Sequence, residues 1–202
     1  MQAILSLLTI PFMFLNFFGG IVSGIWLAVL GQWWAIGYGV VGLFVSSTLI
    51  GLAMMPGLIF AAPAAILAQK GKLILAFPLM LLSQLYTYLV IIAWCIFVFI
   101  VFMSYSNSSS FWPLLIWSYG VALGPLMYMV QREERAGGGD GSWMTTFFAQ
   151  LAYVAMALTA AFARVSLLDL AIVFSGLMLL GMIIQIGFAV AILVEQKRLG
   201  MI

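Results

Sequence analysis

Long apolar runs separated by short polar segments set the organisation of this chain. Residues 73–103 form the clearest run: they contain no charged side chain, follow Lys70 and Lys72, and end before a Ser/Asn-rich segment at 104–110. A helix of roughly 20 apolar residues crosses about 30 Å of hydrocarbon. Residues 73–103 are therefore long enough to cross a membrane as a tilted helix.

The remaining apolar sequence divides in the same way. Two tryptophans mark a break at residues 31–34, because indole side chains favour the headgroup level of a bilayer. The pattern predicts an all-α integral membrane protein with six transmembrane helices in a single domain, 1–202. The expected spans cover residues 4–28, 35–55, 73–103, 111–130, 143–163 and 170–194.

A proline interrupts the second span. Pro56 has no amide donor and its ring clashes with the preceding helical turn. The apolar residues that follow, 58–68, are too few to cross a bilayer alone. We expect them to continue the second helix beyond a proline kink; a re-entrant or interfacial segment is the alternative.

Composition places the chain in a membrane, and its few charges predict an orientation. The chain is 66% hydrophobic and 6% charged, whereas soluble domains carry about 25% charged residues. With six spans, most of the basic residues lie on one side, and the positive-inside rule makes that side the cytoplasm. We therefore expect both termini in the cytoplasm, in a bacterial inner membrane or its equivalent. The residues that set this orientation are Lys70, Lys72, Arg132, Arg135, Lys197 and Arg198.

Several kinds of chemistry are disfavoured by what the chain lacks. It has no histidine and a single cysteine, Cys95, so the commonest general base and metal ligand is missing. The predicted spans hold no charged residue in their interiors. We therefore expect no catalytic, metal or cofactor site, and hence no enzyme. The net charge of +2 is too small to indicate binding to nucleic acid.

Neutral polar residues provide the candidate functional positions. At 1.5 Å rise per residue, each predicted span brings one or more of them to a similar depth near mid-membrane. This predicted polar belt consists of Asn16, Ser47, Ser83, Gln84, Ser118, Gln150 and Gln185. Small residues at four-residue spacing predict close helix packing, because they let two backbones approach. They are Gly20 and Gly24 in the first span and Gly120 and Gly124 in the fourth.

Two functions are compatible with this pattern. In the favoured interpretation, the belt residues bond to one another inside the bundle, and the chain is an accessory or scaffolding subunit of a larger membrane complex. Its partners are then the lipid bilayer and other membrane subunits or further copies of itself. In the alternative, the belt lines a passive channel or facilitator for a small neutral solute or ion.

Overall fold

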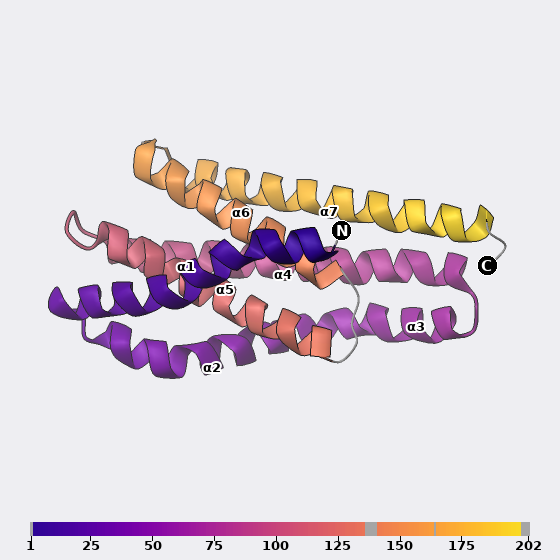
Figure 1. Cartoon of the computed structure of the whole chain (residues 1–202), viewed down its shortest axis with the longest axis horizontal. Helices are drawn as coiled ribbons and strands as arrows, with labels where there is room; N and C mark the ends of the chain where they lie inside the picture. Colours follow the sequence, from indigo (N-terminus) through magenta and orange to yellow (C-terminus); the bar gives the residue numbers. More distant parts are fainter. Residues whose placement is uncertain (1, 136–140, 164, 199–202) are drawn as a thin grey trace.

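The computed structural model is a bundle of antiparallel helices (Figure 1). It describes residues 2–135, 141–163 and 165–198; within these, the side chains at 2–9, 12, 13, 16, 38–44, 128–135, 141, 142, 193, 196 and 197 are not described. The described chain holds seven α-helices and a short 3-10 turn, η1. Their bounds are α1 Gln2–Val29, α2 Trp34–Met54, η1 Met55–Gly57, α3 Leu58–Gln69, α4 Leu73–Ser104, α5 Phe111–Arg135, α6 Gly141–Phe162 and α7 Leu167–Arg198.

Four helical segments of the described chain are long and apolar enough to cross a membrane. They are Val45–Gln69, Leu73–Ser104, Trp143–Phe162 and Leu167–Ile192. The described parts of α1 and α5 contribute shorter apolar stretches, Phe17–Val29 and Phe111–Met127. The all-helical fold is thereby confirmed, and the four long apolar helices support a multi-pass membrane protein. The count of six spans and the side of the membrane that each end faces stay predictions.

Glycine ends two of these helices in the same way. Gly31 after α1 and Gly71 after α3 have positive φ angles, 84° and 71°, a conformation that side chains with a Cβ atom disfavour. In both turns the glycine N–H donates to the carbonyl three residues earlier, and the next N–H, of Gln32 or Lys72, donates to the carbonyl five residues earlier. This is the Schellman arrangement, which lets the chain reverse direction directly.

The second predicted span continues past Pro56 as one helical path. The backbone stays right-handed helical through η1, and α3 follows at once, so the segment runs unbroken from α2 to Gln69. Tyr86 of α4 supports the turn: its hydroxyl donates to the carbonyl of Ala53, three residues before the proline, at 2.8 Å. Gly57 is buried, and a Cβ atom there would lie 3.1 Å from the Tyr86 ring. A neighbouring side chain thus bonds to the helix backbone just before the proline.

A second proline is supported in the same manner. Pro125 lies inside α5. Trp94 of α4 donates its indole N–H to the carbonyl of Ala122, again three residues before the proline, at 3.1 Å. Helix α4 therefore supplies an aromatic donor to each of two proline-containing neighbours.

The core lies where α4, α5, α6 and α7 meet. Its fully buried members include Tyr88 and Cys95 of α4, Leu123 of α5, Tyr153 of α6 and Phe174 of α7. Helix α1 packs on α5 and α2, whereas α3 packs mainly on α4. The interior is therefore centred on the helices from α4 to α7.

Candidate functional site

One cluster of buried polar side chains joins α4, α6 and α7. The hydroxyl of Tyr88 donates to Oε1 of Gln185 at 2.7 Å. Thr145 Oγ1 lies 3.2 Å from the same oxygen and 3.4 Å from the Tyr88 hydroxyl. Tyr88 is fully buried and Thr145 is buried. Because an amide oxygen has two lone pairs, Gln185 can accept from two neighbouring helices at once.

A second cluster joins α5 and α6. The Tyr153 hydroxyl donates to Ser118 Oγ at 2.9 Å, and Ser118 Oγ donates onward to the carbonyl of Leu115 at 2.8 Å. Tyr153 and Ser118 are fully buried. The Tyr153 ring also packs edge-on against three other rings, at centroid separations of 5.8 Å, 6.1 Å and 6.3 Å: Tyr119, Phe99 and Phe174.

Gln150 differs from these residues because one end of its amide has no partner. Its Nε2 donates to the Met127 sulfur at 2.7 Å. Its Oε1 is buried and accepts no hydrogen bond. A buried polar atom without a partner costs about 1–3 kcal/mol. Gln150 therefore has spare capacity to accept a hydrogen bond.

The predicted belt is spread over more than one depth. Tyr153 and Thr145 lie about 12 Å apart along α6 at 1.5 Å per residue, so the two clusters occupy different levels. The hydrogen bonds described for Ser118, Gln150 and Gln185 run to residues outside the predicted set. Ser47, Ser83 and Gln84 are half-buried, and the side chain of Asn16 lies outside the described residues.

Sequence reasoning missed three hydroxyl-bearing residues of the two clusters. The predicted belt included Ser118 and Gln185, but it left out the donors Tyr88, Thr145 and Tyr153. Spacing held part of this information: Tyr153 follows Gln150 by three residues, and residues three apart share a helix face. The pairing of Tyr88 with Gln185 joins residues far apart in the chain, so no local spacing could reveal it.

The small residues occupy different environments. Gly24 is buried, and a Cβ atom there would meet the Trp117 ring of α5 at 3.5 Å, so Gly24 packs inside the chain. A Cβ atom on Gly20 would meet nothing within 4 Å. Gly120 and Gly124 are half-buried on α5. Among the glycines whose surroundings are described, the tightest approach is at one that the spacing did not select: Gly181 of α7 lies directly against the Phe148 ring of α6.

Of the basic residues predicted to set the orientation, those with described side chains lie at one end of the bundle. Lys70, Lys72 and Arg198 are exposed at the end that holds the α3–α4 turn and the end of α7 (Figure 1). The side chains of Arg132, Arg135 and Lys197 lie outside the described residues.

Metal-binding chemistry and comparison with known proteins add no further site. Among the described residues, no three His, Cys, Asp or Glu side chains come together in a way that could hold a metal ion. Comparisons with protein-family models, with curated proteins and with solved structures return no match.

Proposed function

We propose that this chain is a non-enzymatic accessory or scaffolding subunit of a larger membrane complex, with six transmembrane spans and both termini in the cytoplasm. The observation that carries the proposal is how the interior hydroxyl groups are used. Tyr88 of α4 bonds to Gln185 of α7, and Tyr153 of α6 bonds to Ser118 of α5, so each bond joins two helices. Polar contacts of this kind hold helices together in lipid, at about 0.6–2 kcal/mol each.

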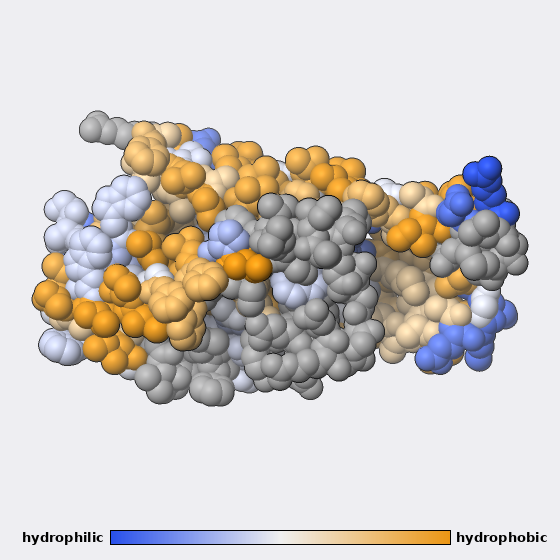
Figure 2. All heavy atoms as spheres, in the orientation of Figure 1, coloured by the Kyte–Doolittle hydropathy of each residue, from blue (hydrophilic) through white to orange (hydrophobic). Residues whose placement is uncertain are grey.

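The exposed surface supports the same proposal. Outside the grey part, much of the face in Figure 2 is hydrophobic, and hydrophilic residues gather toward its two ends. Exposed large apolar side chains of α1 include Phe17, Val22 and Ile25, each at least half exposed. Such a surface needs lipid or protein against it. A subunit with short loops offers it as packing area within a membrane assembly.

The direct test is extraction of the tagged chain from its own host in mild detergent, followed by quantitative mass spectrometry of what co-purifies. The proposal predicts a fixed stoichiometric set of other membrane proteins. An unrelated tagged multi-pass protein from the same membrane serves as the control for adventitious capture. A lone monomer or a homo-oligomer would refute the subunit assignment.

A channel or facilitator for a small neutral solute is the second candidate, and the unpartnered Oε1 of Gln150 favours it. A solute or water that donates a hydrogen bond could pass this oxygen. The channel reading predicts that Gln150→Leu changes flux of small neutral solutes into proteoliposomes. A change in thermal stability with flux unaltered would remove its main support.

A further inference from the structure

Three helices run far past the rest of the bundle at one end. Thr145, near the start of α6, contacts Tyr88 and Gln185. Residues 73–87 of α4 and 186–198 of α7 therefore extend roughly 20 Å beyond this contact, at 1.5 Å per residue. Helix α3 runs alongside α4 over this stretch (Figure 1). We call α3, residues 73–87 and residues 186–198 the arm.

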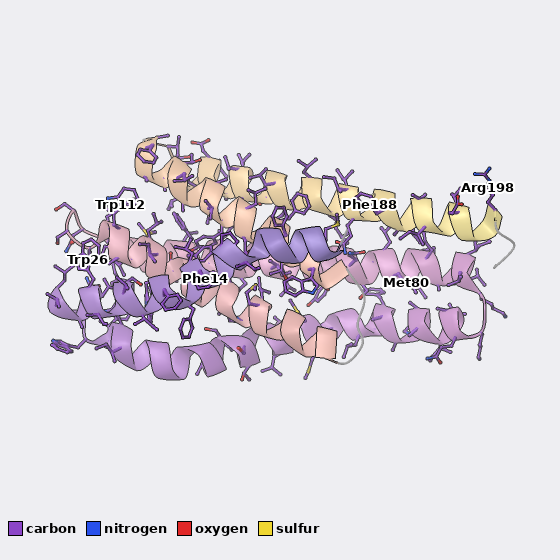
Figure 3. The ribbon with its side chains drawn as sticks, in the orientation of Figure 1. Phe14, Trp26, Met80, Trp112, Phe188 and Arg198 are labelled. Atoms are coloured by element: carbon purple, nitrogen blue, oxygen red, sulfur yellow. The ribbon has the colours of Figure 1, made fainter. Side chains whose placement is uncertain are left out.

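Within the arm, small buried residues let α3 and α4 pack closely, and the outer surface of the arm is apolar. Ala64 of α3 and Ala76 of α4 are fully buried. Its outer surface carries large exposed apolar side chains, among them Met80 and Phe188, whose positions Figure 3 marks. The most exposed are Ile74 at 83%, Ile59 at 71% and Val194 at 63%. Water is a poor solvent for such a surface, so the arm needs an apolar environment.

The tip of the arm is basic. The positive φ of Gly71 turns the chain between Lys70 and Lys72, and both lysines are exposed. Arg198, labelled in Figure 3, is exposed at the end of α7. Glu195 is the one acidic residue among the described residues of the arm. The described tip therefore carries an excess of positive charge, directly beyond the exposed apolar side chains of the arm.

The length of α4 matches a bilayer with its headgroup layers. Tyr88, which contacts Thr145 near the start of α6, lies at the middle of α4, so the arm occupies one half of that length. Helix α4 has 32 residues, about 48 Å; at a tilt of roughly 20° it spans about 45 Å, which is the thickness including both headgroup layers. The basic tip then lies at the level of lipid phosphates.

We propose that the arm is a docking surface for anionic phospholipid. The lipid phosphate binds the cations of the tip, Lys70, Lys72 and Arg198, and the acyl chains lie along the exposed apolar side chains of the arm. A phospholipid fits because it combines an anionic head with an apolar tail in the order that the surface presents. This lipid site would be present whether or not the chain assembles with other subunits.

The test measures which lipids the purified full-length chain retains. The protein is exchanged into an equimolar mixture of phosphatidylglycerol and phosphatidylcholine in detergent, and the bound lipids are quantified by mass spectrometry. Wild type should enrich phosphatidylglycerol over the mixture. Neutralising the tip with Lys70→Gln, Lys72→Gln and Arg198→Gln should reduce that enrichment by about fivefold for each cation removed.

Two control variants make the result decisive. Arg132→Gln with Arg135→Gln removes cations at the end of α5, and this variant should keep the wild-type enrichment. Lys70→Arg with Lys72→Arg preserves the charge of the tip, and this variant should also show the wild-type enrichment of phosphatidylglycerol. Unchanged enrichment in the neutralised-tip variant, or an equal loss in the Arg132/Arg135 variant, would overturn the proposal. Circular dichroism of each variant verifies that the helices are intact.

Discussion

At the scale of single residues, the hydroxyl groups of two tyrosines form hydrogen bonds between helices. Tyr153 combines a hydrogen bond to Ser118 with edge-on contacts to neighbouring rings. Each aromatic pair contributes about 0.5–1.5 kcal/mol beyond the area it buries. Tyr88 plays a similar part at another level of the bundle through Gln185. These two tyrosines each satisfy a polar end while filling apolar space.

Gly181 gives the sharpest residue-level prediction. A Cβ atom at this position would lie 2.7 Å from Cβ of Phe148, close to the root of that side chain, where a rotamer change gives little relief. Gly181→Ala should therefore destabilise the fold by about 1–3 kcal/mol through overpacking. The measurement is the unfolding free energy in detergent micelles.

Two other glycines of α7 provide the matched comparison. A Cβ atom on Gly176 or Gly187 would meet nothing within 4 Å, and alanine favours a helix over glycine by up to about 1 kcal/mol. Gly187→Ala should leave stability unchanged or raise it. An equal loss in Gly181→Ala and Gly187→Ala would argue against close packing of α6 on α7 at this point.

At the scale of whole elements, the ends and breaks of helices depend on specific bonds. Helix α7 starts behind a reciprocal cap: Ser166 Oγ accepts from the Asp169 N–H at 3.2 Å, and the Ser166 N–H donates to the Asp169 carboxylate at 3.0 Å. This is the capping-box arrangement. It explains why the helix begins at Leu167, before the expected start at residue 170.

Two proline-containing segments, the Pro56 turn and α5, receive hydrogen bonds from side chains of α4. Removing the Tyr86 hydroxyl with Tyr86→Phe should lower stability by about 1 kcal/mol, since the Ala53 carbonyl loses its donor. Trp94→Phe should cost more, because it removes both the N–H bond to Ala122 and part of a packed ring. Thermal unfolding of each variant provides the measurement. Tyr105→Phe, which alters an exposed tyrosine outside these contacts, should be neutral; comparable losses in all three variants would contradict the assignment.

How far the sequence predicts this structure differs between its parts. Apolar runs predict α4 almost to the residue, because its ends coincide with Lys72 and with Ser104. They also predict that the path continues past Pro56. They do not predict that Tyr88 meets Gln185, because that contact depends on how distant helices pack. In a sequence made mostly of apolar residues, many helix packings are compatible with the same hydrophobic pattern. Only the tertiary structure determines which residues of distant helices form contacts.

At the scale of the whole molecule, the proposed orientation follows from which connections share an end. The α3–α4 turn and the end of α7 lie at one end, and the α4–α5 connection lies at the other (Figure 1). In a Cys95→Ala background, Ser108→Cys should react with a membrane-impermeant maleimide added outside intact cells, whereas Gln69→Cys should react only after the cells are opened. Labelling in the reverse order would contradict the orientation.

The proposal of a structural subunit requires that interior polar groups hold the helices together, and a double-mutant cycle on Tyr88 and Gln185 tests this directly. The variants are Tyr88→Phe, Gln185→Leu and both together, with Tyr88→Phe and Tyr153→Phe as a control pair from separate clusters. We expect a coupling free energy of about 0.6–1.7 kcal/mol for the first pair and additivity for the second. A coupling between Tyr88 and Gln185 that is indistinguishable from zero would contradict the proposal.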